Sequence, residues 1–247
     1  MKLINVIASG LMFSASVAYA GAIDLNTWNQ SGNSSNGNWN VAADGTSVLQ
    51  TINGNPTFFI SNDSFINNQF TGTFGVETTS DDDFIGFVFG YNGLDDFYLF
   101  DWKQSEQNYL GNTGSEGFTL SKISAGADVN SLNALWGHTG NGIDVLDTDY
   151  GNDRGWIDNT TYDFTLNYTD TSIDIFINGG TFSDENIFSL AGLNNDSGNF
   201  GFFNSSQSQV RYTGFKEEAT SVPESSTLTI FALAIAGLFW RRKITNK

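Results

Sequence analysis

The segment from Asp81 to Gln104 constrains the fold of this chain more than any other. Three consecutive aspartates lead directly into a long aromatic run, and an Asn-Gly pair separates that run from a second one. With a two-residue period, one face of the first run carries Ile85, Phe87, Phe89 and Tyr91, and the other carries Phe84 and Val88. A strand that is apolar on one face and partly apolar on the other is typical of the middle of a two-sheet sandwich.

Other alternating segments recur along the chain, and none has helical periodicity. They cover residues 70–76, 97–100, 162–168, 173–177 and 210–215. We expect hairpins at residues 91–96, around the Asn-Gly pair, and at residues 168–172. Roughly 200 residues lie between the two patterned ends of the chain, which is enough for a single core. The pattern therefore predicts one all-β sandwich domain over residues 21–217.

Residues 1–20 have the pattern of a secretory signal peptide. Lys2 supplies the positive start, an apolar stretch follows, and the small residues Ala18 and Ala20 define the predicted cleavage site. The chain contains no cysteine, which is compatible with export into an oxidising compartment.

The C-terminal end has a second processing pattern. An acidic tether over residues 218–224 contains Pro223 and Glu224, and it precedes the apolar stretch 225–240 and a basic tail. This arrangement resembles the PEP-CTERM sorting signal of proteins that an exosortase processes. The resemblance implies a sorting helix over residues 225–247, transient insertion in the inner membrane, and release to the surface or exterior; a permanent single-span anchor is the alternative.

The chain between the two ends is strongly acidic. Residues 21–221 contain 26 carboxylates and five cationic side chains, so that this part carries a net charge of −21, against −17 for the whole chain. Such a surface repels nucleic acid and anionic lipid, so we expect no nucleic-acid partner. The acidity is also explained by solubility alone.

Several ordered motifs resemble the thrombospondin C-terminal domain family. Besides Asp81–Gln104, they are Asn133–Trp136 with His138–Asn141, Gly155–Asp158, and the late glycine-phenylalanine segment Gly198–Phe203. The resemblance implies a jelly-roll, concanavalin-like two-sheet sandwich that is extracellular, binds calcium and takes part in adhesion.

Calcium is the cofactor that we expect, because it takes six to eight oxygen ligands in flexible geometry. At a separation of roughly 6 Å and an effective dielectric of about 20, adjacent carboxylates repel by about 3 kcal/mol, and a cation removes that repulsion. The first candidate metal site is Asp81, Asp82 and Asp83, with Asp101, Asp95 or Asp96 as a further ligand from across the hairpin. The second is Asp147, Asp149 and Asp153. The alternative for both is a solvated turn.

Aromatic residues near loops are candidates for binding sugars. Trp136 and Trp156 lie in the family-like motifs, and Tyr109 and Tyr150 are further possibilities; for each, packing in the core is the alternative. His138 is the only histidine, and we expect it to make a structural hydrogen bond.

No catalytic pattern accompanies these features. Sugar hydrolases on related sandwiches commonly carry Glu-x-Asp-x-Glu along one strand, and that spacing is absent here. We therefore expect a secreted or surface-displayed, calcium-binding, non-catalytic adhesion or biofilm-matrix module whose partner is extracellular polysaccharide or a surface protein. A structural matrix component without a ligand, or a polysaccharide hydrolase or lyase, is the alternative.

Overall fold

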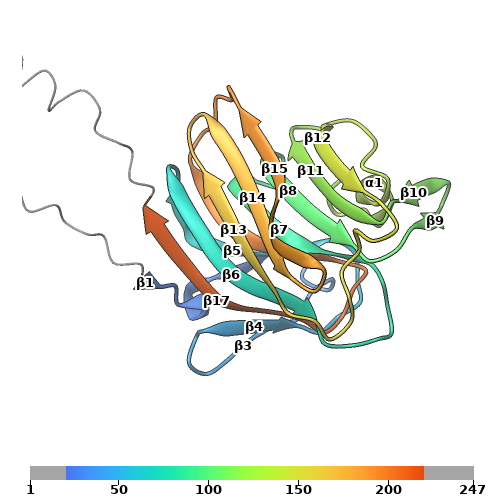
Figure 1. Ribbon diagram of the computed structural model, residues 1–247, viewed down its shortest axis with the longest axis horizontal. Helices are drawn as coiled ribbons and strands as arrows, with labels where there is room; N and C mark the ends of the chain where they lie inside the picture. Colours follow the sequence, from blue (N-terminus) through green and yellow to red (C-terminus); the bar gives the residue numbers. More distant parts are fainter. Residues whose placement is uncertain (1–20, 220–247) are drawn as a thin grey trace, which may run out of the picture.

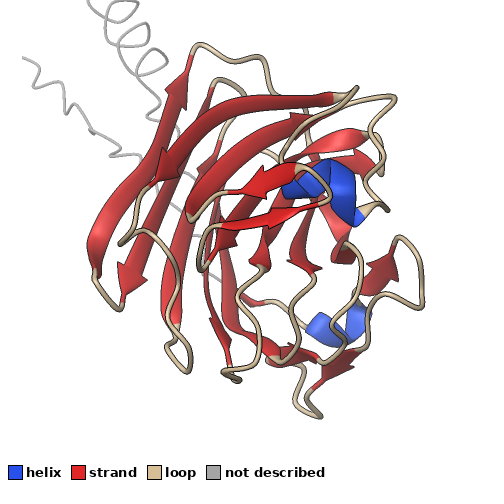
Figure 2. Ribbon diagram, turned by 90° about the vertical axis from the view of Figure 1, so that its right-hand side faces the viewer, coloured by secondary structure: helices blue, strands red, loops and turns tan. Residues whose placement is uncertain are grey.

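Two antiparallel sheets account for most of the residues that the structure describes, which are residues 21–219 of a computed structural model. The sheets pack face to face as two layers (Figures 1 and 2). Within residues 21–219, helical structure is limited to the 3-10 turn η1 (Leu25–Thr27) and the short helix α1 (Leu132–Trp136). The predicted all-β jelly-roll sandwich is confirmed.

The larger sheet has eight strands in the order β15-β14-β13-β6-β17-β4-β3, with β1 also paired to β17. Its strands are β1 (Gly21–Ala22), β3 (Trp39–Val41), β4 (Ser47–Gln50), β6 (Asn68–Val76), β13 (Tyr162–Tyr168), β14 (Ser172–Gly179), β15 (Phe182–Ala191) and β17 (Val210–Ala219).

The smaller sheet has seven strands in the order β12-β11-β8-β7-β16-β5-β2. Its strands are β2 (Asn29–Ser31), β5 (Thr57–Phe65), β7 (Phe84–Gly93), β8 (Asp96–Lys103), β11 (Gly117–Ile123), β12 (Ile143–Tyr150) and β16 (Gly198–Ser205). A separate hairpin of β9 (Gln107–Tyr109) and β10 (Asn112–Gly114) extends from this sheet, at the right of Figure 1.

Aromatic rings from both sheets fill the space between the layers. Phe87 of β7 and Phe100 of β8 stack with ring centroids 4.6 Å apart, and Phe87 also contacts Phe164 of β13 at 4.9 Å. Trp102 and Phe118 stack at 4.4 Å. Burial of such large rings is the main stabilising contribution to a sandwich of this kind.

A second apolar cluster covers the outer face of the seven-stranded sheet. Side chains of the sheet such as Phe84, Val88 and Leu99 pack there against Leu135 and Trp136, which belong to α1. The segment around α1 therefore closes the centre of this outer face.

The structure confirms both predicted hairpins, β7–β8 and β13–β14, and corrects two details. A β-bulge between Phe89 and Gly93 turns Tyr91 away from the inner core, so that its ring packs on Phe97 of the outer cluster at 5.4 Å. In addition, β17 continues to Ala219, which pairs with Asn68; strand pairing thus extends into the predicted tether.

The predicted signal peptide (1–20), the processing residues Pro223 and Glu224, and the sorting helix (225–247) lie outside the described residues. Within the described part of the chain, no helix has the length and apolar character needed to cross a membrane.

Candidate functional site

The three consecutive aspartates lie directly before β7, at the point where the chain enters the middle of the seven-stranded sheet. One carboxylate oxygen from each of Asp81, Asp82 and Asp83 lies within 4.8 Å of the others. Asp81 and Asp82 are half-buried, whereas Asp83 is only 4% exposed. The sequence-predicted cluster therefore exists as a spatial group, and its burial increases along the chain.

A lysine from the neighbouring strand occupies the inner side of this group. Lys103, the last residue of β8, is fully buried. Its Nζ atom lies 2.6 Å from Asp83 Oδ1 and 3.2 Å from Asp82 Oδ1, and it donates to the Asp82 carbonyl oxygen at 3.1 Å. The same ammonium lies over the Trp136 ring, 4.8 Å from its centroid. The inner carboxylates are thus already paired with a cation that the protein itself supplies.

The outer carboxylates have only neutral partners besides this lysine. The Asn53 amide donates to Asp81, and the Ser105 hydroxyl donates to the outer oxygen of Asp82. The backbone N–H of Asp82 donates to Asp81 Oδ1 at 3.1 Å. These neutral donors leave most of the negative charge of Asp81 uncompensated.

Burial raises the pKa of the Asp83 carboxyl to about 6, although the hydrogen bond and charge of Lys103 lower it. Removal of the carboxylate from water is the larger effect, because a charged group loses its hydration inside the protein. The ion pair with Lys103 therefore stabilises the ionised form of Asp83, whereas burial alone favours the protonated form.

The cluster fits a calcium ion in part. Calcium prefers six to eight oxygen ligands, and Asp81, Asp82 and the Ser105 hydroxyl offer such oxygens on the exposed side. Asp83 does not fit this ligand set, because its Oδ1 atom is 2.6 Å from an ammonium that would repel a divalent ion.

The structure separates Asp101 from this cluster, which corrects the sequence prediction. Asp101 lies on the outer face of β8, fully buried, and His138 Nε2 is 2.8 Å from its Oδ2 atom. Burial raises the pKa of Asp101, and the nearby His138 lowers it. His138 thus makes a structural hydrogen bond that fixes the segment after α1 to the sheet.

The second predicted metal site is also not assembled. Asp147 and Asp149 lie on β12, an edge strand, and Asp149 pairs with Arg154. Across residues 21–219, the group of three at Asp81–Asp83 is the one set of carboxylates or histidines close enough to share a metal ion. Asp147, Asp149 and Asp153 therefore form no common ligand set, because an extended edge strand spreads them apart.

The two tryptophans that were sugar-binding candidates are both packed inside the domain. Trp136 and Trp156 are each 2% exposed; the Trp136 indole N–H donates to Gln107 O at 3.1 Å, and that of Trp156 to Asp83 O at 3.0 Å. Neither ring face is available for stacking, so the packing alternative is correct for both. Among the side chains that the structure describes, the exposed aromatic ones are instead Tyr109, at 39%, and Tyr150, at 43%.

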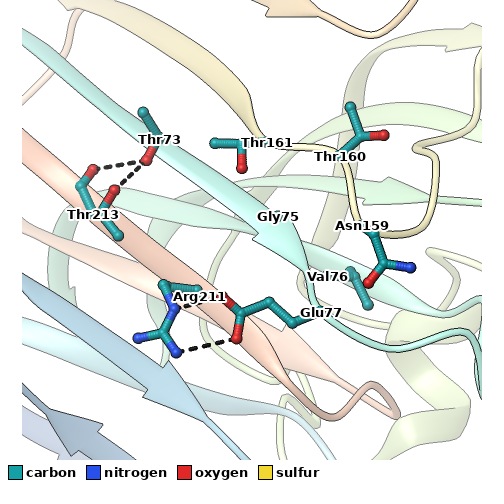
Figure 3. Close-up of a pocket in the computed structure, with 9 residues that line it drawn as sticks. All are labelled: Thr73, Gly75, Val76, Glu77, Asn159, Thr160, Thr161, Arg211 and Thr213. Atoms are coloured by element: carbon teal, nitrogen blue, oxygen red, sulfur yellow. Dashed lines mark hydrogen bonds and ion pairs between the residues drawn. The ribbon is translucent and has the colours of Figure 1, made fainter.

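A depression of about 220 Å³ lies on the outer face of the eight-stranded sheet (Figure 3). Its lining is polar, and two pairs of its side chains are bonded to each other. The Arg211 guanidinium makes two hydrogen bonds to the Glu77 carboxylate, at 2.5 and 3.0 Å, and the Thr73 hydroxyl donates to Thr213 O at 3.2 Å.

A second depression, of about 280 Å³, lies beside the end of β12. It is lined by Glu106, Ser115, Glu116, Tyr150, Gly151 and Asn152. Sequence reasoning did not identify this site, because its residues come from three separate segments that no motif connects. The exposed Tyr150 was the only part of it that the sequence suggested.

Solved structures with the same fold are found among known proteins. The carbohydrate binding module CBM66 from Bacillus subtilis superposes with a TM-score of 0.52 at 11% identity, covering 78% of this chain and 95% of that one. The VIP36 exoplasmic/lumenal domain in its Ca2+/Man2-bound form superposes with a TM-score of 0.51 at 11% identity, covering 81% and 85%. At such identities the likeness concerns the fold alone, which is that of lectin-like sandwiches.

Sequence comparison gives the family. The family described as the thrombospondin C-terminal region matches residues 34–220, and the chain belongs to it. Thrombospondin-3 of Homo sapiens is 37% identical over 138 residues, which are 52% of this chain and 14% of that protein. Cartilage oligomeric matrix protein of Rattus norvegicus is 36% identical over 140 residues, 53% of this chain and 18% of that protein. The chain thus matches less than a fifth of the length of these relatives.

Proposed function

We propose that this chain is a non-catalytic, lectin-like recognition module that acts outside the cell and binds extracellular polysaccharide or a surface protein. The observation that carries the proposal is the combination of a thrombospondin C-terminal sequence with a lectin-like sandwich. One structural relative is titled a carbohydrate binding module, and another was solved with mannose units bound. Cartilage oligomeric matrix protein, a sequence relative, is a matrix protein by name.

Calcium binding forms part of this proposal. Asp81 and Asp82 would hold the ion, with Ser105 as an additional oxygen donor. A bound calcium ion would cancel the repulsion between the two exposed carboxylates and fix the loop that enters β7.

Export and processing also form part of the proposal, and their support comes from the sequence alone. The patterns at Ala18–Ala20 and at Pro223–Glu224 favour export through the inner membrane followed by cleavage by an exosortase-type enzyme. Mass spectrometry of the protein from an exosortase-competent host is then expected to find no residues beyond about Pro223. Recovery of an intact C-terminus through Lys247 would favour a permanent anchor instead.

A glycan array probed with the purified domain tests the recognition function directly. Residues 21–219 form the described sandwich and are the part to be screened, in parallel with calcium and with EDTA. We expect binding to a defined group of glycans, stronger in calcium. Absence of binding to every glycan and to extracellular matrix extracts would favour a purely structural component, and release of sugar products would contradict the non-catalytic assignment.

A further inference from the structure

We infer that the depression beside Tyr150 is the glycan-binding site of this domain and that it takes a neutral sugar unit. This inference rests on the proposed function and identifies the surface that would perform it. The depression combines an exposed aromatic ring with carboxylate, hydroxyl and amide groups around one concave surface of about 280 Å³.

Tyr150 supplies the apolar surface of the site. A sugar ring presents C–H groups on one face, and aromatic side chains bind such faces because the contact removes apolar area from water. The Tyr150 side chain is 43% exposed, but its hydroxyl is hydrogen-bonded to Thr119 Oγ1 at 2.8 Å. The ring is therefore held in place before a ligand arrives, which reduces the entropy lost on binding.

The polar lining has unused hydrogen-bonding capacity. Within the described residues, the Glu106 carboxylate, the Ser115 hydroxyl and the Asn152 amide have no hydrogen-bond partner. Glu116 uses one oxygen, which accepts from Gly155 N–H at 3.3 Å. Sugar hydroxyls are donors that match carboxylate acceptors, and hydrogen bonds to an ionised group are stronger than those between neutral groups.

The turn that follows Tyr150 is fixed against the sheet. Gly151 N–H donates to Glu116 O at 3.3 Å, and Arg154 N–H donates to Gly151 O at 3.1 Å. The Arg154 guanidinium in turn pairs with Asp149 and with Glu185, the latter at 2.9 Å. The wall of the depression is thus preorganised by bonds that do not involve its free polar groups.

Gly155 joins the segment that carries Glu106 to this turn. A Cβ atom at position 155 would overlap the backbone carbonyl of Gln104, so only glycine permits the observed approach. This contact brings residues 104–106 beside the turn 151–155. The depression is therefore built into the backbone packing of two segments that are distant in sequence.

The electrostatics select the class of sugar. Glu106 and Glu116 both line the depression, and residues 21–221 carry a net charge of −21. Uronic acids, sulfated sugars and phosphates are repelled from such a surface, whereas neutral hydroxyl groups are not. The volume lies near the lower end of small-molecule sites, which span about 300–1,000 Å³, and this suits a single sugar unit of a larger chain.

The depression of Figure 3 differs in two respects. It has no exposed aromatic side chain, and its Arg211 and Glu77 side chains are paired with each other. A ligand that bound to Arg211 or Glu77 would have to break their existing hydrogen bonds before making its own. It therefore serves as the internal reference for the test.

The experiment compares variants of the domain on an array of neutral and acidic glycans, followed by titration with the neutral oligosaccharide that the array identifies. We expect Tyr150→Ala to lower the affinity roughly tenfold or more and Tyr150→Phe, which keeps the ring, to retain most of it. Glu106→Gln is expected to weaken binding, because it exchanges a charged acceptor for a neutral one. Tyr109→Ala, which removes an exposed tyrosine outside the depression, and Thr73→Val, in the other depression, are the controls and should bind as the native domain does.

The outcomes separate this inference from the proposed function. If the native domain binds a glycan and both Tyr150→Ala and Glu106→Gln bind it equally well, the function stands and the site is wrong. The same holds if Thr73→Val is the variant that loses binding, or if the preferred glycans are acidic. If the native domain binds no glycan at all, the proposed function fails and the site fails with it. Should Tyr150→Ala not fold, as judged by its melting curve, Glu106→Gln decides between these results.

Discussion

Two acidic segments adjoin the same seven-stranded sheet and differ in what surrounds their carboxylates. Asp81–Asp83 leads into β7, a central strand, and the third carboxylate is buried against Lys103. Asp147 and Asp149 lie on β12, at the sheet edge, and only Asp149 of the two is paired with a cation. Both segments looked like cation sites in the sequence. The comparison shows that depth within the sheet, rather than the number of nearby aspartates, determines whether carboxylates gather around a cation.

The substitution Lys103→Met tests the buried side of this comparison and should have the largest effect. It leaves Asp83 inside the protein without its ammonium, a loss that typically destabilises a protein by about 3–5 kcal/mol. Urea unfolding at pH 7 measures the change. Lys122→Met is the control, because Lys122 pairs with Asp96 at the surface and should cost at most about 1 kcal/mol. Equal effects of the two substitutions would mean that the buried ion pair contributes no more to stability than the surface ion pair does.

The pH dependence of stability should follow Asp83. The pKa of this carboxyl is about 6 in the folded protein, against 3.8 for an ordinary aspartate, so the folded state binds this proton more tightly. The resulting stabilisation is fully present below about pH 4 and is lost as the pH rises through about 6, with a magnitude of at most about 3 kcal/mol.

The variant Asp83→Asn isolates this effect, because an amide does not titrate. The native domain should lose stability relative to the variant as the pH rises from about 4 to about 6, so that the unfolding free energy of the native domain minus that of the variant decreases. Parallel profiles over that range, measured by urea titration at each pH, would show that Asp83 does not titrate there.

Calcium binding tests the exposed carboxylates of the cluster, Asp81 and Asp82, separately from the buried Asp83. At about 100 times its dissociation constant, one bound ion stabilises the domain by about 2.7 kcal/mol, or about 5–10 °C in melting temperature. We expect the double substitution Asp81→Asn with Asp82→Asn to abolish this shift. Asp147→Asn with Asp153→Asn removes the same charge from the other acidic segment and should leave it intact. Equal melting temperatures of the native domain in calcium and in EDTA would argue against a calcium site.

The smallest effect is expected at the sheet edge. The double variant Asp147→Asn with Asp153→Asn alters exposed side chains, so its unfolding free energy should stay within about 0.5 kcal/mol of the native value. Chemical denaturation in the absence of calcium measures it. A loss of several kcal/mol would reveal an interaction of these residues that the structure does not contain.

The sequence predicted the sandwich because the two-residue period of its strands depends only on local geometry. The apolar alternation at Ile85, Phe87 and Phe89 placed these residues in the inner core, where the structure has them. The prediction failed at Tyr91, where a bulge reverses the side-chain direction.

The same bulge explains why the partner of Asp83 was not anticipated. Gly93 pairs with Asp96, but after the bulge Phe89 pairs with Tyr98, a register that differs by two residues. Without that shift, Lys103 would lie opposite Gly86, farther from the aspartates. The position of Lys103 thus depends on an irregularity that no periodic pattern encodes.

The depression beside Tyr150 was also beyond local reasoning. Its carboxylates, Glu106 and Glu116, come from either side of the β9–β10 hairpin, and the tyrosine ends a different strand. The pairing of β11 with β12 and the contact of Gly155 with the Gln104 backbone bring these segments together. The roles of Trp136 and Trp156, in contrast, could not be assigned from the sequence, because packing in the core and ligand binding both favour large aromatic rings.

The placement of β17 has a mechanical consequence. This strand lies inside the eight-stranded sheet, between β6 and β4, and its last residues pair with β6 while Gly21 of β1 lies opposite Glu217 (Figure 1). A pull applied along the chain beyond Ala219 would load the hydrogen bonds of these ladders in shear, so that several must break at once rather than one after another. In Figure 1 the β9–β10 hairpin lies on the side away from this end. If the domain were anchored through β17 and bound a ligand near Tyr150, a force between anchor and ligand would therefore act across the whole sandwich.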